Sequence, residues 1–339
     1  MMKRPTIREI AAHAGVSQGA VSYALNGRRG VSEATRNRVV EIARQLGWTP
    51  GGGTHRHVRR SRALGMVVNR SATGLAGEPF FGALMSGIQR ELAPGSVSLL
   101  MQTAPNSSAE LEIHRRWHRE QAVGGVFLLD LRIGDTRPDE LAAIGLPAVA
   151  LGGPLDRLDV PSVWMNDRQT MRGVLEYLAA LGHRSVVRVA GPETFLQTRT
   201  RTDAFAAAAC HLGLADARTV HADYSEEGGA DTARRVLKSK RPPTALVFDN
   251  DVMAVGGLVA AQGLGLRVPA DLSIVAWDDS VLCRLVRPAL SAVQRPIAEF
   301  GALAVSVLRR KIDGEKAVDT CASTPVFAVR GSTGPVRRR

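Results

Sequence analysis

The first fifty residues contain three short runs in which apolar side chains recur at helical spacing. In the first run the apolar positions are Ile7, Ile10, Ala11 and Ala14. Thr6 precedes this run and Glu9 follows three residues later, which is the pattern of a capping box, and Gly15 supplies a tight turn. The spacing predicts a first helix that begins after Thr6 and ends at Ala14.

Two further helices are expected before residue 50. Ser17 is placed to cap a helix from Gln18 to Leu25, whose inward positions are Val21, Ala24 and Leu25. Ser32 is placed to cap a third helix. The residues of this helix expected in a small shared core are Val39, Val40, Ile42, Ala43 and Leu46. The outward face of the second helix then consists of Gln18, Gly19, Ser22 and Tyr23. This arrangement is typical of a helix-turn-helix head that reads DNA with its second helix.

From Ala63 onward, strand-like apolar runs alternate with helix-like stretches. The first block reads ALGMVV, FGALMSGIQREL, VSLLMQ, AELEIHRRWHREQ and GVFLLD. After a VPSVWM run, a second block reads MRGVLEYLAALG, SVVRVAG, RTDAFAAAACHLG, ALVFDN, VMAVGGLVAAQGLG and LSIVAWDD. The alternation predicts an α/β fold with two doubly wound lobes, each built on a parallel sheet flanked by helices.

Charge supports the interpretation of the head. The chain carries a net charge of +12, and residues 1–62 hold 12 Lys or Arg against 3 Glu, a net +9 (12 − 3) in less than a fifth of the length. Such a concentration of positive charge on a helix-turn-helix pattern favours binding to phosphates of DNA over an ordinary solvated surface.

The residues of the head closely resemble a known family. The run VSQGAVSYALNGRRGVSEATRNRVVEIARQLGW resembles the head of the lactose-repressor (LacI) family of bacterial transcription regulators. The remainder resembles the effector module of that family through LAALGHRSVVRVAG, RTRTDAF, PPTALVFDNDVMAVGGLVAAQGLGLRVPADLSIVAWDDS and VFAVRGST. The resemblance implies a module like a periplasmic sugar-binding protein, with ligand between two lobes joined by three crossings near 162–164, 291–293 and 320–324.

The resemblance also implies domain boundaries. We expect a head at 1–50, a hinge or linker at 51–62, an effector-binding and dimerisation module at 63–333 and a basic, disordered tail at 334–339. Within the module, lobe 1 is expected at 63–162 and 293–322, and lobe 2 at 163–292 and 323–333.

DNA contacts are expected on and around the second helix. The candidate residues are Thr6, Ser17, Gln18, Gly19, Ser22, Tyr23, Asn26, Arg28, Arg36 and Arg56. Gln18 is the expected direct reader, because its amide can pair bidentately with adenine. Tyr23 stands where the family usually has Arg, and a phenol cannot form the bidentate pair with guanine.

The linker departs from the family's hinge helix. Gly51, Gly52 and Gly53 would each cost a helix about 1 kcal/mol relative to Ala, and the position of the family's Leu wedge falls on His57 or Val58. A folded hinge helix is therefore not expected, and we predict strongly salt-dependent binding with little DNA bending.

Ligands of open parallel sheets bind beyond the carboxyl ends of the strands. Polar side chains follow several apolar runs there: Asn69 and Arg70, Asp130, Asn250 and Asp251, and Asp278 and Asp279. With residues that the resemblance places in the cleft, the candidate effector-binding set is Asn69, Phe80, Asp130, Arg201, Tyr224, Asn250, Trp277, Asp278 and Arg295. Helix capping is the alternative role for Asn250 and Asp279, and core packing is the alternative for Phe80.

The cleft chemistry suggests two ligand classes. Carboxylates and amides suit polyhydroxylated ligands such as sugars, whereas Arg201 and Arg295 together would favour an acidic or phosphorylated ligand if both point inward.

The preferred interpretation is a homodimeric repressor in the cytoplasm, associated with the nucleoid, whose operator affinity is set by a sugar or sugar derivative. The alternatives are an activator with a non-sugar ligand and a solute-binding module without DNA function. An enzyme is disfavoured because the chain lacks GxGxxG after a strand, GxxxxGK[ST], HExxH and GxSxG motifs. No cofactor, metal or membrane partner is expected, since neither the three scattered cysteines nor the eight histidines form metal-ligand spacings and no signal peptide or long apolar run is present.

Overall fold

The structure is a computed structural model that describes residues 6–25, 30–46, 63–69, 78–95, 97–155 and 159–336. The chain divides into two compact units, Met1–Ser61 and Arg62–Arg339.

The head consists of α1 (Ile7–Ala14), α2 (Gln18–Leu25) and α3 (Glu33–Gln45). The predicted caps are confirmed: Thr6 and Glu9 form a reciprocal capping box on α1, and Gly15 ends that helix with a left-handed φ of 63°. Ser17 Oγ accepts a hydrogen bond from the backbone N–H of Ala20, and Ser32 Oγ accepts one from that of Thr35.

A small apolar cluster holds the three helices of the head together. Its buried members are Ile10, Ala11, Ala14, Val21, Ala24, Val39 and Ala43. The prediction that Val40 joins this core is wrong, because Val40 is 45% exposed and does not belong to the cluster. With so few buried residues the head has a minimal core.

Lobe 1 is built on a six-stranded parallel sheet in the order β11-β5-β4-β3-β1-β2. Its strands are β1 (Ala63–Val68), β2 (Ser98–Thr103), β3 (Gly125–Leu128), β4 (Ala148–Leu151), β5 (Ser162–Trp164) and β11 (Thr320–Cys321). Its helices are α5 (Pro79–Leu92), α6 (Ser107–Glu120), α7 (Arg137–Ala143) and α13 (Ile297–Ile312).

Lobe 2 repeats this plan in the order β12-β10-β9-β8-β6-β7, with only β12 antiparallel to its neighbour. Its strands are β6 (Ser185–Ala190), β7 (Asp216–His221), β8 (Ala245–Phe248), β9 (Ser273–Trp277), β10 (Ser291–Gln294) and β12 (Val326–Ala328). Its helices are α8 (Asp167–Ala180), α9 (Leu196–His211), α10 (Glu226–Leu237), α11 (Asp251–Gly263) and α12 (Val281–Leu285). Together with the head, these two sheets confirm the predicted fold class.

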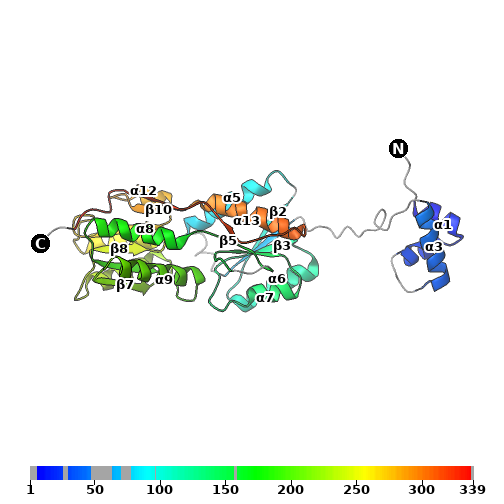
Figure 1. Cartoon of the computed structure of the whole chain (residues 1–339), viewed down its shortest axis with the longest axis horizontal. Helices are drawn as coiled ribbons and strands as arrows, with labels where there is room; N and C mark the ends of the chain where they lie inside the picture. Colours follow the sequence, from blue (N-terminus) through cyan, green and yellow to red (C-terminus); the bar gives the residue numbers. More distant parts are fainter. Residues whose placement is uncertain are drawn as a thin grey trace. The chain divides into compact units, whose positions relative to one another are not determined.

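The chain passes between the lobes three times, after β5, after β10 and after β11. As a consequence α13 and β11, which come late in the sequence, complete lobe 1. Figure 1 shows α13 beside α5, although more than two hundred residues separate them in the sequence. The two helices approach so closely that a Cβ at Gly87 of α5 would lie 1.8 Å from the carbonyl oxygen of Ala298.

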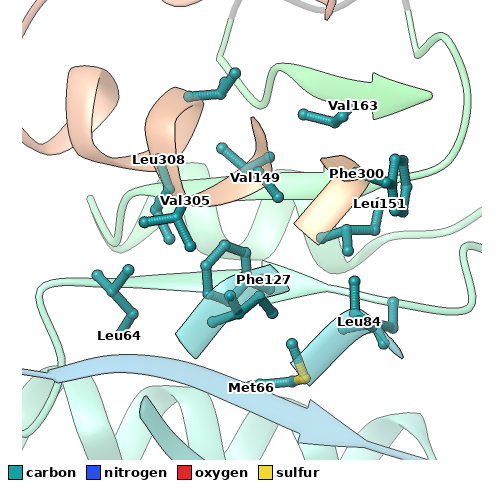
Figure 2. Close-up of a cluster of buried hydrophobic side chains, with 14 of the residues drawn as sticks. Leu64, Met66, Leu84, Phe127, Val149, Leu151, Val163, Phe300, Val305 and Leu308 are labelled. Atoms are coloured by element: carbon teal, nitrogen blue, oxygen red, sulfur yellow. The ribbon is translucent and has the colours of Figure 1, made fainter. Parts of the chain in front are cut away.

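The core of lobe 1 lies between its sheet and the α5/α13 pair. Figure 2 shows strand side chains such as Met66, Phe127 and Val149 facing Leu84 of α5 and Val305 of α13, and all of these are fully buried. The continuous apolar runs of the strands follow from this burial, because helices cover both faces of a parallel sheet.

The first residues of the expected tail, 334–336, are bonded to lobe 2. The backbone N–H of Val336 donates to the carbonyl of Leu181 at 3.0 Å, and the carbonyl of Gly334 accepts from the buried ring of His183 at 3.1 Å. Residues 334–336 therefore belong to lobe 2, because His183 and Ser273 bond the backbone of Gly334 and Leu181 bonds that of Val336. Residues 337–339 lie outside the described residues.

Candidate ligand cleft and DNA-reading head

A cleft opens between the two lobes at the carboxyl ends of both sheets. Lobe 1 contributes residues that follow β3, β4 and β5, together with the start of α5 and the start of α13. Lobe 2 contributes the first turns of α9 and residues that follow β7, β8 and β9. Most of the sequence-predicted effector residues line it: Phe80, Asp130, Arg201, Tyr224, Asn250, Asp278 and Arg295.

Arg201 lies on α9 and is only 3% exposed. Its Nε donates to Oδ2 of Asp167 at 2.6 Å, and its guanidinium carbon lies 4.8 Å from the ring centroid of Trp277. Burial alone would lower the pKa of Arg201, but the charges of Asp167 and Asp249 outweigh burial, so the pKa is raised. Arg201 is therefore a fixed cation whose charge the protein already balances.

Asp249 is held by a second buried arginine. Nε and Nη2 of Arg188 donate to its two carboxylate oxygens at 2.8 and 2.5 Å, and neither side chain is exposed. Arg188 comes from the middle of β6, so the pair ties the carboxyl end of β8 to the neighbouring strand. This bidentate pair fixes the orientation of Asp249 on the cleft wall.

Tyr224 stands at a left-handed backbone position, with φ of 70°. Its ring lies against Gly191 so closely that a Cβ there would be 2.0 Å from the ring, and burial raises the pKa of its hydroxyl to about 12. Asn250 supports the same residue, because its side-chain amide donates to the carbonyl of Tyr224 at 2.9 Å. Asn250 also caps α11 by accepting from the backbone N–H of Met253, so the capping role considered for it is confirmed.

Arg295 closes one side of the cleft. Its Nη1 donates to both oxygens of Asp278 at 3.0 and 3.2 Å, and its guanidinium carbon lies 5.7 Å from the ring centroid of Phe80. Phe80 is thus a cleft wall, whereas Phe81 is buried in the lobe 1 core. The pairing of Arg295 with Asp278 removes the main argument for an acidic ligand, because the positive charge is compensated within the wall.

The cleft is acidic. Its carboxylates are Glu78, Asp130, Asp167, Asp249, Asp251 and Asp278, and its cations are Arg201 and Arg295. Among the described residues, three buried atoms on its wall have no hydrogen-bond partner: Asp167 Oδ1, Asp251 Oδ2 and Arg295 Nε. Burial raises the pKa of Asp251 to about 6. Such a wall offers acceptors and one donor to a ligand rich in hydroxyl groups.

Sequence reasoning missed Asp167 and Asp249 as site residues. Asp249 directly precedes the Asn250–Asp251 pair, so its place at the end of β8 was a readable signal. Asp167 follows the first crossing, and only the fold shows that this crossing passes the cleft.

Two predicted effector residues lie outside the cleft lining. Trp277 is fully buried, and its ring packs against the guanidinium of Arg201 and so orients that group. Asn69 lies beside the start of α6. When its amide oxygen faces Arg132 and Ser107, this oxygen accepts hydrogen bonds from Arg132 Nη2 at 2.8 Å and from the backbone N–H of Ser107 at 3.0 Å. Arg70 lies outside the described residues.

The lobes also touch across the mouth of the cleft. The backbone N–H of Leu196 donates to the carbonyl of Leu131 at 2.7 Å, and that of Ile133 donates to the carbonyl of Thr194 at 3.1 Å. Arg132 and Phe195 thereby form an antiparallel bridge, which we call the interlobe bridge. The guanidinium of Arg132 lies 6.0 Å from the ring centroid of Phe195.

In the head, α2 presents the face expected to read DNA. Gln18 and Gly19 are exposed, Ser22 is half-buried and Tyr23 is 43% exposed. Thr6 and Ser17 are engaged as helix caps, and Arg36 donates from Nη1 to the carbonyl of Ala24 at 3.1 Å. The remaining predicted contacts and the linker lie outside the described residues: Asn26, Arg28, Arg56, Gly51–Gly53, His57 and Val58.

The described part of the chain contains no group of three or more His, Cys, Asp or Glu side chains placed to hold a metal ion. None of its helices has the length and apolar character needed to cross a membrane.

Comparison with known proteins gives consistent matches for both the head and the two-lobed module. Residues 6–51 match the family described as bacterial regulatory proteins, lacI family, and residues 175–333 match the periplasmic binding protein-like domain. The chain is 33% identical to the HTH-type transcriptional regulator MalR of Streptomyces coelicolor, over 96% of each chain.

Solved structures agree with these matches. A LacI family transcriptional regulator from Bifidobacterium animalis subsp. lactis superposes with a TM-score of 0.76 at 32% identity, covering 82% of this chain and all of the other. A complex of the transcriptional regulator CelR with cellobiose superposes with a TM-score of 0.73 at 27% identity, covering 97% of this chain and all of the other.

Proposed function

This chain belongs to the LacI family of bacterial regulatory proteins, and we propose that it is a repressor whose affinity for operator DNA is set by a carbohydrate bound between its two lobes. The observation that carries this proposal is the composition of the cleft wall. Its carboxylates outnumber its guanidinium groups, and both guanidinium groups are paired with carboxylates of the same wall.

This wall favours neutral, polyhydroxylated ligands. A sugar hydroxyl donates one hydrogen bond and accepts others, so it can satisfy the unpartnered oxygens of Asp167 and Asp251 and the Nε of Arg295. An anionic ligand would instead meet a net negative surface, since neither Arg201 nor Arg295 brings an uncompensated charge. The relative solved with cellobiose supports the same ligand class.

The interlobe bridge can couple ligand binding to the relative arrangement of the two lobes. Tyr224 on the cleft wall stacks on Phe195, which forms the bridge with Arg132. A ligand that contacts Tyr224 and binds the bridged arrangement of the lobes more tightly than the unbridged one shifts the protein toward the bridged arrangement. The resulting change in operator affinity cannot exceed the difference between the ligand's affinities for these two arrangements. The sign of that change, induction or corepression, is read directly in the experiment below.

DNA recognition is assigned to α2. The exposed side-chain amide of Gln18 is the proposed reader of adenine. Tyr23 stands where the family usually has an arginine that can pair with guanine. Since Arg36 donates to the end of α2, its proposed role is to hold that helix as well as to attract phosphates.

We further propose that the protein acts as a homodimer on two half-sites in the cytoplasm, where the operator lies. Neighbouring helices α11 and α12 carry exposed apolar side chains, with Val259 and Val281 each 53% exposed and Leu285 68% exposed. Exposed apolar side chains on neighbouring helices are what a self-complementary interface would bury. Leu285→Asp is expected to convert the dimer to a monomer in sedimentation velocity measurements.

The central experiment is a fluorescence-anisotropy titration of the full-length protein on DNA from upstream of its own gene, with and without sugars. We expect tight binding to this DNA, and a change in affinity when a recognised sugar is present. Gln18→Ala should weaken operator binding by about 1–3 kcal/mol and leave binding to random DNA unchanged. Gln45→Ala is the control, because it removes an exposed amide from α3, outside the reading face of α2.

Two results would contradict the proposal. Equal affinity for upstream and random DNA would favour a solute-binding module without DNA function. Operator binding that no sugar alters, with a response to a non-sugar metabolite, would favour the alternative ligand class.

A further inference from the structure

The loop between β3 and α7, residues 129–136, carries the lobe 1 half of the interlobe bridge. We call it the bridge loop. Asp130 on this loop lines the cleft, and the nearby residues Leu131 and Ile133 make the two backbone hydrogen bonds to lobe 2. Part of the ligand wall and the contact between the lobes thus belong to one short segment, and the conformation of that segment affects both.

The backbone of the bridge loop is strained and needs support. Asp130 has a φ of 48°, in the left-handed region that residues other than glycine rarely adopt. Such a conformation persists only where the surrounding structure holds it. Nη2 of Arg137 lies 3.0 Å from the carbonyl oxygen of Leu129 and 3.1 Å from that of Asp130. Because these two carbonyls flank the Cα of Asp130, Arg137 holds the strained residue directly.

Two buried carboxylates fix Arg137 in this position. Its Nη1 donates to Oε1 of Glu110 on α6 at 2.6 Å, and its Nε and Nη2 donate to the carboxylate of Asp135 at 3.0 and 2.6 Å. The exposed fraction is 3% for the side chain of Arg137, 0% for that of Glu110 and 9% for that of Asp135. Asp135 also accepts from the backbone N–H of Arg132 at 3.1 Å. The same carboxylate therefore binds both the planar guanidinium and the bridge loop.

We propose that Arg137 is a positioning residue for the ligand response: by holding the bridge loop, it sets the place of Asp130 in the cleft and the hydrogen bonds that join the lobes. This inference rests on the proposed function, in which a ligand in the cleft acts through the arrangement of the lobes. Among the described residues, Arg137 lies outside the cleft lining. A change at Arg137 therefore reaches the cleft and the other lobe only through the loop.

The backbone amide of Leu196 reports the state of the bridge. Leu196 is the first residue of α9, so its N–H has no partner within that helix. It donates instead to the carbonyl of Leu131 in lobe 1. Hydrogen exchange at this amide of lobe 2 consequently measures how firmly a loop of lobe 1 is held. The measurement uses the full-length protein without ligand.

The test is Arg137→Lys, followed by hydrogen exchange resolved to single residues. Lysine keeps the positive charge beside the two carboxylates, but one ammonium group cannot reach Glu110, Asp135 and the loop carbonyls together. Exchange at Leu196 is expected to become about tenfold faster, because the loop opens more often.

Arg115→Lys is the matched control. Arg115 also binds two carboxylates, Glu112 of α6 and Glu140 of α7, and in the described structure its hydrogen bonds stay on those two helices. A general loosening of α6 and α7 would affect both variants alike. Exchange at Leu196 in Arg115→Lys should therefore equal that of the unmodified protein.

Operator affinity provides a second readout. Leu196→Pro removes the same hydrogen bond from the lobe 2 side, at a helix position where proline is well accommodated. Leu196→Ala keeps the N–H and controls for the lost side chain. Without ligand, Arg137→Lys and Leu196→Pro are expected to change the affinity for upstream DNA in the same direction, by about threefold or more. Because both variants break one contact, their double variant should show no more than the larger single effect.

The outcomes separate this inference from the proposed function. Unchanged exchange at Leu196 in folded Arg137→Lys, equal acceleration by Arg115→Lys, or additive effects in the double variant overturn the inference and leave the proposed function standing. Faster exchange without any change in DNA affinity supports the hold of Arg137 on the loop and contradicts the coupling of the lobes to DNA.

A second variant decides if Arg137→Lys does not fold, as judged by circular dichroism. Asp135→Asn replaces one of two acceptor oxygens with an NH2 donor, so the bond to Arg132 or one bond to Arg137 is lost. Faster exchange at Leu196 in this variant supports the inference, and exchange equal to that of the unmodified protein overturns it.

Discussion

The ring of Phe195 lies nearly parallel to the ring of Tyr224, with centroids 6.3 Å apart and planes inclined by 13°. Tyr224 faces the cleft, and Phe195 is the lobe 2 residue of the interlobe bridge. The contact therefore connects the ligand wall to the one place, among the described residues, where backbone hydrogen bonds join the lobes across the cleft mouth.

The first prediction concerns this stack. Phe195→Ala removes a ring pair worth about 1 kcal/mol, so ligand affinity is expected to fall about fivefold. The change in operator affinity caused by ligand is expected to fall as well, because Tyr224 no longer contacts the bridge. Calorimetry and anisotropy titrations measure the two effects. Phe195→Tyr keeps the ring and should behave as the unmodified protein, and identical behaviour of Phe195→Ala would refute the connection.

The second prediction concerns the buried ion pair of Arg188 and Asp249. Arg188→Ala leaves the carboxylate of Asp249 buried without its partner, which is expected to lower the free energy of unfolding by about 3–5 kcal/mol. Urea denaturation followed by circular dichroism measures the loss. Arg199 and Asp203 form an exposed pair on α9, so Arg199→Ala is the control and should cost about 0.5 kcal/mol or less. A similar small cost for Arg188→Ala would show that Asp249 does not need this partner.

The third prediction is a pH dependence that Asp251 causes. Because burial raises its pKa from 3.8 to about 6, the folded protein binds this proton more tightly than the unfolded chain does. The contribution of Asp251 to stability is thus fully present below about pH 4 and is lost as the pH rises through about 6. Asp251→Asn stays uncharged at every pH, so its free energy of unfolding should increase relative to that of the unmodified protein between pH 4 and 7.

Urea denaturation at a series of pH values tests this expectation. A constant difference between Asp251→Asn and the unmodified protein would mean that Asp251 titrates alike in the folded and unfolded states.

The fourth prediction concerns the contact of α5 with α13. A methyl group at Gly87 would lie 1.8 Å from the carbonyl oxygen of Ala298, so the helices must separate to accept Gly87→Ala. We expect a loss of about 1–3 kcal/mol in the free energy of unfolding. Gly82→Ala on the same helix has open space and should be neutral or stabilising by up to about 1 kcal/mol. Equal stability of the two variants would argue against close packing at Gly87.

Much of the fold was predictable because its signals are local. The alternation of apolar runs located β1, β3, β6, β8 and β9 to within two residues, since strands buried on both faces are continuously apolar. The caps of the head were equally readable, because Thr6 and Glu9 act within one turn. Val40 was misjudged because helical spacing alone does not show how wide the buried face of a short helix is.

The cleft was only partly predictable. The rule that ligands bind beyond the ends of parallel strands pointed to Asp130, Asn250 and Asp278, which line it. The electrostatics of the site depend on pairs distant in sequence, such as Arg201 with Asp167 and Arg295 with Asp278. Because the sequence does not reveal those pairs, it suggested an affinity for acids that the compensated arginines do not support.

The late position of α13 in the chain has a consequence for synthesis on the ribosome. Residues of β1 to β5 emerge before any of lobe 2, yet α13, which covers Met66, Phe127 and Val149, begins only at Ile297. At bacterial elongation rates this interval lasts on the order of ten seconds. During that time α5 alone covers this face of the nascent lobe 1 sheet, so we expect the yield of folded protein to depend on the speed of translation.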